Sequence, residues 1–384
     1  MTPALSERRR RLDDWMFDAA FPMWWRLGAD HEAGGFQEAI DLTGQVVLKP
    51  RRARVQARQV FSYAAAGRFG WRGPWREAVA HGLDFFVKNY RRPDGLFRTL
   101  VARDGSPLDE ATWLYDQAFA LLALAEADSA LDRPDLRSVA RRLAEALEVL
   151  RLPGGGYSEA SPDQPYQSNP HMHLFEACLA CEPRDPEGPW TAMADDIAGR
   201  ALSRYLDANG ALHEYFAADW SPAEGVAGRI VEPGHQFEWA WLLERWSRLR
   251  RRPDAHTAAR RLYEIGAAHG VDPVRGVAFD QLLDDFSAYQ PMARLWPQTE
   301  RLKAALILAE GAGSAGSAYL DDAANAVDGL FKYLDVDIGG LWRDKMNPDG
   351  SFVDEPAPAS SFYHIVCAAE ELRRLVPTPG DQPS

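Results

Sequence analysis

The chain has 384 residues, of which 46% are hydrophobic, and a formal net charge of −13. This acidic balance argues against a nucleic-acid partner, because binding a polyanion requires clustered Lys and Arg side chains. The sequence has no apolar run of about 18 residues and no signal-peptide core, so we predict a cytoplasmic protein with no membrane partner.

Twelve helix-period apolar patterns follow one another along the chain. They cover residues 5–27, 51–68, 75–90, 112–127, 135–150, 171–181, 190–206, 234–249, 255–268, 297–310, 317–333 and 360–375. Several begin beside a proline, which the first turn of a helix tolerates. No linker rich in Ser, Gly or Pro interrupts the series, so we predict a single domain over residues 1–384.

A short glycine-led apolar turn separates the helices of each predicted pair. Its copies recur about every 60 residues and begin at Gly35, Gly95, Gly156, Gly210, Gly276 and Gly340. Repeated helix pairs become stable by burying their apolar faces against neighbouring pairs. The sequence therefore predicts a nearly all-α ring of six helix pairs, in which residues at the same phase of different repeats meet at one mouth.

Short β-hairpins are predicted on one face of the ring. Residues 35–44, 96–105 and 341–350 each combine a short apolar segment with a turn dipeptide. Longer connections lie at about residues 152–170, 207–233, 270–296 and 334–359 and exceed what a plain helical ring needs. We expect them to build the walls of a functional site.

Two histidines are the predicted catalytic residues. Pro233 and Gly234 open a helix, so His235 stands on its first turn and Glu238 lies three residues later on the same side. An imidazole suits proton transfer at neutral pH. His364 begins the last helix at the same phase of another repeat, and the two rings can flank a small ligand. A packing role for His364 is the alternative.

Other polar residues at helix starts are predicted to bind substrate. An inward guanidinium can stabilise an oxyanion, and either Arg54 or Arg58 is placed for that role. Trp296 offers a stacking plane for a sugar ring, with Gln298 and Glu300 as hydroxyl partners. The predicted substrate-binding residues are Arg58, Tyr115, Asn169, His173, Glu238, Trp296 and Glu300.

No metal or cofactor is predicted. Cys178 and Cys181 form a CxxC inside a helical run without a second pair, which favours buried small side chains over a zinc or redox site. His171 and His173 point to different sides of a helix, so a metal pair would need an extended segment. Phosphate-loop, dinucleotide and HExxH motifs are missing.

Four of these segments, in this order, resemble the N-acylglucosamine 2-epimerase superfamily, and more closely its mannose isomerase branch. Arg58 and Tyr115 also match positions of the family. The resemblance implies an (α/α)6 barrel, which agrees with the predicted ring. The segments are Asn169, His173 and Glu176; Gly234, His235 and Glu238; Trp296, Gln298 and Glu300; and Tyr363 with His364.

The resemblance also implies an activity. Members act without a metal on an open-chain aldose, where one histidine removes the C2 proton and Arg58 stabilises a cis-enediolate. Ala359 and Ser360 stand where cellobiose-type members carry a tryptophan, so the preferred reaction is free D-mannose to D-fructose. A sugar 2-epimerase is the alternative.

Two further classes stay open on the same scaffold. A glycoside hydrolase would recruit Asp116 with Glu238 or Glu300. A carbohydrate-binding protein without turnover would keep Trp296 and Tyr115 but would tolerate loss of both histidines. In every case the predicted partner is a small sugar, and the sequence leaves a homo-oligomer open.

Overall fold

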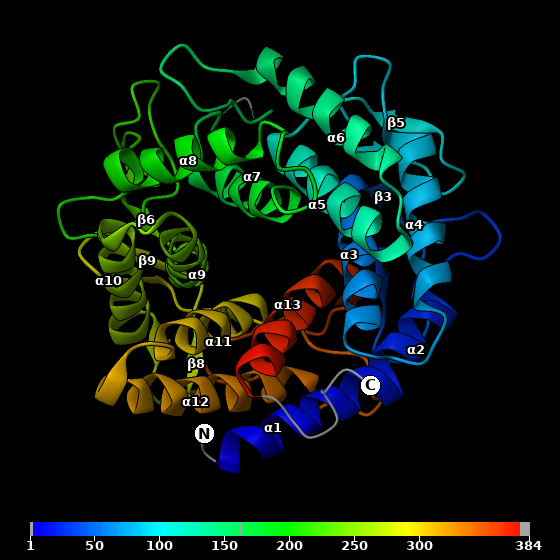
Figure 1. Cartoon of the computed structure of the whole chain (residues 1–384). Helices are drawn as coiled ribbons and strands as arrows, with labels where there is room; N and C mark the ends of the chain where they lie inside the picture. The colour runs from blue at the N-terminus through cyan, green and yellow to red at the C-terminus, as the bar shows by residue number, and fades with distance from the viewer. Residues whose placement is uncertain (1–2, 162, 377–384) are drawn as a thin grey trace.

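The helices form two concentric rings (Figure 1). This computed structural model describes residues 3–161 and 163–376, so the ends of the predicted domain and residue 162 lie outside the described residues. The inner helices are α3 (Ala53–Arg68), α5 (Leu114–Leu131), α7 (Ser168–Cys181), α9 (Pro233–Arg250), α11 (Trp296–Ala309) and α13 (Ala359–Leu375). The outer helices are α1 (Pro3–Asp14), α4 (Trp75–Tyr90), α6 (Asp135–Ala146), α8 (Trp190–Arg200), α10 (Pro253–His269) and α12 (Gly316–Leu334).

Helix contacts close the inner ring. Each inner helix packs against the next, and α13 packs against α3. Each outer helix packs on its inner partner, and α1 lies against both α12 and α13. The six predicted helix pairs and the predicted (α/α)6 barrel are therefore confirmed.

Side-chain chemistry separates the two rings. In α5 almost every residue from Leu114 to Asp128 is buried, because the helix is covered on both sides. The outer helix α6 buries only one stripe, led by Leu136 and Leu143, and exposes charged residues on the other side. An all-round apolar helix becomes an inner one, and an amphipathic helix covers it.

The first predicted helix is real but irregular. After α1 the chain continues through η1 (Trp15–Ala20), α2 (Phe21–Met23) and η2 (Trp24–Gly28), and both η segments have π-helical hydrogen bonding. Pro22 lacks an N–H group, so the regular ladder cannot run unbroken through this stretch. Shorter η3 (Leu147–Leu150) and η4 (Ala201–Tyr205) continue α6 and α8.

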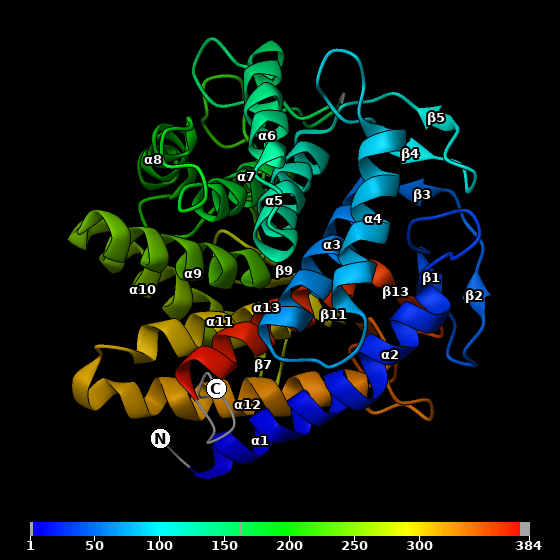
Figure 2. The ribbon, with the colours of Figure 1, turned by 45° about the vertical axis from the view of Figure 1, so that its right-hand side comes forward.

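Small β-ribbons gather at one side of the ring (Figure 2). The first two predicted hairpins are confirmed as β1 (Ala39–Ile40) with β2 (Val46–Val47), and β4 (Leu100–Val101) with β5 (Pro107–Asp109). Ribbons also join distant segments, since β13 (Ala357–Pro358) pairs with β1, and β3 (Arg51–Arg52) with β4. The remaining strands are β6 (Ile230–Val231), β7 (Val271–Asp272), β8 (Val277–Ala278), β9 (Gln281–Leu283) and β10 (Ala288–Gln290).

The third predicted hairpin is wrong in its first strand. Leu341 and Trp342 form no strand, because both side chains are fully buried and Trp342 stacks on Trp24 with ring centroids 4.9 Å apart. The strand lies later, at β12 (Lys345–Met346), and pairs with β11 (Ala293–Arg294). Met346 then makes a single bridge to Phe352.

A buried glutamine fastens the glycine turn to the next inner helix in four of the six units. All six repeat glycines have φ between +71° and +93°, a backbone conformation that glycine adopts more easily than other residues. The glutamine side chain accepts from a backbone N–H and donates to the C=O of the same residue near the turn. The pairs are Gln56 with Phe36, Gln117 with Phe97, Gln236 with Leu212 and Gln298 with Ala278.

These clamps correct one prediction. Gln298 is fully buried and bonded to the backbone of Ala278 and Arg294, so it is no hydroxyl partner for a sugar. Among the described residues, no helix combines the length and the apolar character needed to cross a membrane.

Candidate active site

A cavity of about 240 Å³ opens at the mouth where the inner helices begin. The N-termini of these helices carry partial positive charge, which favours a negative charge formed there. Eight of the nine predicted site residues line the cavity: Arg58, Tyr115, Asn169, His173, His235, Glu238, Trp296 and His364. Its walls also include Gln167, Glu214, Tyr215, Glu232 and Arg294 from the long connections, as predicted.

Trp296 contacts both predicted catalytic histidines. Its ring centroid is 4.9 Å from that of His235 and 5.7 Å from that of His364. The side chains of both histidines are buried to more than nine-tenths. The fold thus brings two imidazoles from the fourth and sixth inner helices to one small cavity.

Two carboxylates hold His235. Its Nδ1 lies 2.8 Å from Glu214 Oε2 and 3.3 Å from Glu232 Oε2. Burial alone would lower the pKa of His235, but the charges of Glu214 and Glu232 raise it to about 10. His235 is therefore an imidazolium at neutral pH, with its Nδ1–H donated to Glu214.

His364 is in the opposite state. Burial lowers its pKa well below the ordinary value, and the positive charges of Arg58 and Lys303 lower the pKa further. Its Nδ1 lies 2.9 Å from Glu300 Oε1, within hydrogen-bond distance. When Glu300 is ionised, the neutral ring donates Nδ1–H to it and keeps Nε2 as an acceptor. Glu300 itself is fully buried behind His364 and does not line the cavity, contrary to the predicted substrate contact.

Arg58 brings a guanidinium group to the cavity. Its Nη2 donates to the Tyr115 hydroxyl at 2.5 Å and its Nη1 to the Ser360 carbonyl at 3.3 Å. Its Cζ also lies 4.2 Å from the centroid of the Phe119 ring. These contacts fix a cation beside the two histidines.

Glu238 and His173 form the floor of the cavity. Burial raises the pKa of Glu238 well above the ordinary value, and the neighbouring Glu300 raises that pKa further. Neither carboxyl oxygen of Glu238 has a hydrogen-bond partner in the described protein. Burial also lowers the pKa of His173 to about 4, so its ring is neutral. Burial thus favours the protonated carboxyl of Glu238, which can both donate and accept.

Unpaired polar atoms concentrate in this cavity. Buried polar groups are normally hydrogen-bonded, so a group of unsatisfied ones marks a place where a ligand completes the bonding. The lining residues with such atoms are Arg58 (Nε), Asn169 (Oδ1), His173 (Nδ1), Glu214 (Oε1), Glu238 (both oxygens) and Arg294 (Nε). A ligand with many hydroxyl groups matches this mixture of donors and acceptors.

Several alternative candidates lie away from the cavity. Arg54 forms an ion pair with the fully buried Asp116 at 2.9 Å, and neither lines the cavity. His171 accepts from the Tyr157 N–H and contacts the Gln167 carbonyl, which occupies both of its nitrogens. Cys178 and Cys181 are buried free thiols, as predicted.

Glu214, Glu232 and Arg294 were not predicted from the sequence. All three lie in long connections. Glu214 follows the Gly210 turn, and its backbone N–H donates to the Ile230 carbonyl in β6, the strand that precedes His235. The carboxylates of Glu214 and Glu232 and the Nδ1 of His235 lie within 4.8 Å of one another, a spacing that also suits a cation. The Nδ1 of His235 already makes a hydrogen bond to Glu214 there, where a cation would lie.

Comparisons with known proteins agree with this geometry. A sequence model described as N-acylglucosamine 2-epimerase (GlcNAc 2-epimerase) matches residues 34–368. A mannose-6-phosphate isomerase of Rhizobium meliloti (strain 1021) is 50% identical over 373 residues, which cover 94% of this chain and 95% of that protein.

Two solved structures share the fold. The crystal structure of a D-mannose isomerase aligns with a TM-score of 0.86 at 20% identity and covers 97% of this chain and 100% of that one. The cellobiose 2-epimerase from Spirochaeta thermophila DSM 6192 aligns with a TM-score of 0.86 at 23% identity and covers 97% and 98%.

Proposed function

The chain belongs to the N-acylglucosamine 2-epimerase family, and from that premise we propose that it isomerises free D-mannose to D-fructose. The observation that carries this proposal is a pair of histidines with oppositely shifted pKa values that both contact Trp296 in one cavity. Two titratable groups whose pKa values are pushed apart by their surroundings are the usual sign of an acid and a base. The cavity is also smaller than the pockets of about 300–1,000 Å³ that hold drug-sized ligands, which supports a monosaccharide.

The proposed reaction moves protons only. When the sugar ring opens, His235 as the acid protonates the ring oxygen, and the proton of the anomeric hydroxyl passes back to His235 as the C1 carbonyl forms. His364 Nε2 then removes the C2 proton from the open-chain aldose. The C–H electron pair forms the C1–C2 double bond, and the carbonyl π pair moves to O1. Return of the proton to C1 and transfer of the O2 proton to O1 give the ketose. No oxidant or reductant is consumed.

The negative charge that develops on O1 in the enediolate must be stabilised for this reaction to proceed. Arg58, held by Tyr115, supplies a fixed cation in a buried site, where it acts more strongly than in water. The neutral carboxyl of Glu238 adds a donor without opposing the charge. The helix N-termini around the mouth act in the same direction.

Epimerisation at C2 is the second outcome of the same chemistry. It requires acid–base groups on both faces of C2, and His235 and His364 flank one aromatic ring in the same cavity. Opposite protonation states suit both outcomes, because epimerisation also needs a base on one face of C2 and an acid on the other. Isomerisation is favoured because the 50% identical relative is named an isomerase.

Mannose 6-phosphate is the alternative substrate. The 50% identical relative is named for it, and Arg294 reaches the cavity with an unpaired Nε. Three carboxyl groups, those of Glu214, Glu232 and Glu238, line the same small space. Arg58, Arg294 and the imidazolium of His235 line it as well, so charge does not separate the two substrates. The free sugar is favoured because the cavity, at about 240 Å³, is small.

One experiment separates these proposals. The protein, treated with EDTA, is incubated in D2O with mannose, mannose 6-phosphate, glucose or N-acetylmannosamine, and C2–H exchange and products are followed by NMR. We expect exchange and fructose from mannose. Faster turnover of mannose 6-phosphate would replace the substrate proposal, and a C2 epimer as the first product would replace the isomerase proposal. Cleavage of glycosides without exchange would support a hydrolase.

Place of action and partners belong to the same proposal. All three cysteines are free and buried, which supports a reducing compartment such as the cytoplasm. The partner we propose is the monosaccharide alone, and self-association stays a prediction.

A further inference from the structure

A buried lysine lies beneath the cavity floor. Lys303 on α11 has no exposed surface, and its Nζ is 2.5 Å from Glu300 Oε2. On another side the Nζ lies 3.9 Å from the centroid of the Trp241 ring. A buried ammonium is costly unless paired, so this arrangement needs a reason.

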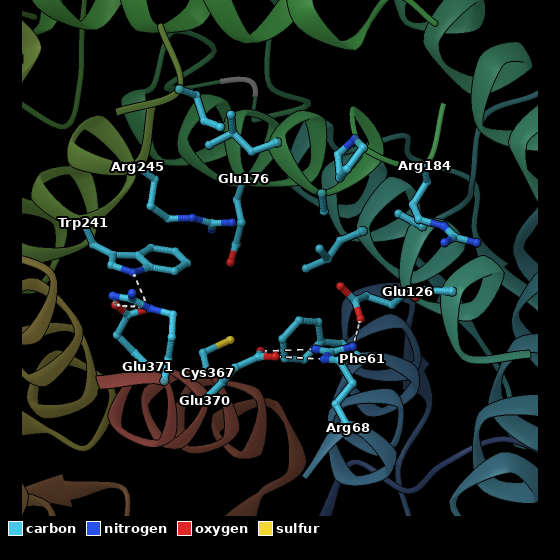
Figure 3. Close-up of a pocket in the computed structure, with 18 of the residues that line it drawn as sticks. Phe61, Arg68, Glu126, Glu176, Arg184, Trp241, Arg245, Cys367, Glu370 and Glu371 are labelled. Atoms are coloured by element: carbon cyan, nitrogen blue, oxygen red, sulfur yellow. Dashed lines mark hydrogen bonds and ion pairs between the residues drawn. The ribbon is translucent and has the colours of Figure 1, made fainter. Parts of the chain in front are cut away.

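Trp241 shields this lysine from a second cavity, at the opposite mouth of the barrel. That cavity has a volume of about 580 Å³, and Glu176, Trp241 and Cys367 are among the residues that line it (Figure 3). The guanidinium of Arg245 covers the Trp241 ring at 4.5 Å. Lys303 therefore meets buried carboxyl groups and an aromatic ring rather than water.

Two carboxyl groups compete for this cation. Atoms of Glu238, Glu300 and His364 lie within 4.8 Å of one another, and two carboxylates so close do not both ionise readily. Among the described residues, the ion pair of Lys303 is made with Glu300. Neither oxygen of Glu238 has a hydrogen-bond partner, and its Oε1 lies 3.8 Å from His173 Nδ1.

We propose that Lys303 is a positioning residue that keeps the negative charge on Glu300, behind His364, and leaves the proton on Glu238, in the cavity. This inference rests on the proposed function, in which His364 is the base. With Glu300 ionised, Nδ1 of His364 donates to it and Nε2 keeps its lone pair toward the substrate. A protonated Glu300 would instead donate to Nδ1 and place the ring proton on Nε2, where the ring cannot act as a base.

The other charged and titratable groups around Lys303 and His364 come from four packed helices. They stay the same when only Lys303 is changed, so a change in behaviour reports the lysine. These groups are Arg58 on α3, His173 and Glu176 on α7, Glu238 on α9, and Tyr363 and Cys367 on α13.

The test replaces the cation and follows kcat against pH. In Lys303→Met, Glu300 takes a proton near neutral pH, so we expect kcat at pH 7 to fall about 10²-fold. The lost activity should return as pH rises and Glu300 ionises. Lys303→Arg should keep most of the activity, and Lys88→Met, at an exposed site on α4, is the matched control. A loss by the same factor at every pH would overturn the proposal.

A double-mutant cycle separates positioning from general damage. If Lys303 acts through Glu300, then Lys303→Met/Glu300→Gln should have the kcat of Glu300→Gln alone. Additive losses would contradict the proposal. The double variant removes both members of the Lys303–Glu300 ion pair together, so the comparison remains available if Lys303→Met alone does not fold.

A measurement without turnover distinguishes this inference from the proposed reaction. ¹⁵N NMR of labelled histidines reports which nitrogen of His364 carries the proton. We expect Nδ1–H in the unaltered protein and Nε2–H in Lys303→Met at pH 7. The same tautomer in both proteins would refute the inference even if the enzyme isomerises mannose, and the expected change would support it even if mannose is not the substrate.

Discussion

Replacing Glu214 by glutamine should lower the pKa of His235, the proposed acid. The change keeps the shape of the side chain but removes the carboxylate that lies 2.8 Å from His235 Nδ1. The rise of the His235 pKa from 6.5 to about 10 corresponds to roughly 5 kcal/mol of preference for the imidazolium, at about 1.4 kcal/mol per pKa unit. Glu214 and Glu232 share this effect, so we expect Glu214→Gln to remove about half of it, roughly 2–3 kcal/mol.

The sign of the pH dependence follows from the direction of the shift. The folded-state pKa of His235 lies above its unfolded value, so its contribution to stability is complete below pH 6.5 and is lost as pH rises through about 10. The unaltered protein should therefore lose stability over this range, and the loss should be smaller in Glu214→Gln. The alkaline decline of kcat/KM should also move from near pH 10 toward neutrality.

Thermal melts and initial rates between pH 6 and pH 10.5 test both statements. Glu187→Gln, at an exposed position, provides the control. If the alkaline decline stays at the same pH in Glu214→Gln, then the carboxylate does not set the protonation of His235 and the assignment of the acid is wrong.

Three further changes probe the oxyanion, the clamps and the turns. Arg58→Gln should lower kcat about 10²–10³-fold with little change in KM, and an equal rise in KM with unchanged kcat, measured by steady-state kinetics, would contradict its role. Gln236→Leu leaves the buried N–H and C=O of Leu212 unpaired and should destabilise the fold by about 2–4 kcal/mol in urea unfolding, whereas exposed Gln45→Leu should not. Gly35→Ala should lower the melting temperature, because φ is +72° and the new Cβ would lie 2.5 Å from Phe85 and 2.7 Å from Gln56 Oε1; an unchanged melting temperature would show that the turn relaxes.

The architecture was predictable because the repeat is periodic. Six glycine turns and twelve apolar patterns are local signals, and each helix pair needs the next one to cover its apolar face. The glutamine clamps were missed although they follow the same repeat, because a glutamine near a helix start looks like a ligand-binding residue. Gln298 was misread for that reason, since only the fold shows that the Ala278 backbone lies beside it.

The site was less predictable than the fold. Histidines at helix starts stand out in the sequence. The residues that set their protonation are their neighbours only in the folded structure. Glu214 and Glu232 lie in irregular connections, and Lys303 lies one turn after Glu300 in an apolar helix, where a lysine would ordinarily reach toward water. The third hairpin failed because burial of Trp342 outweighed local strand preference.

The layer of side chains between the two cavities affects how the enzyme exchanges its ligands. Glu238, Lys303 and Tyr363 separate the two mouths and are almost completely buried, so a hexose has no route through them. In the proposed reaction, the ketose leaves by the same mouth of the barrel through which the aldose enters. The two sugars therefore exclude each other. Accumulating ketose should consequently act as a competitive inhibitor of the forward direction, and net conversion should slow well before the aldose is exhausted.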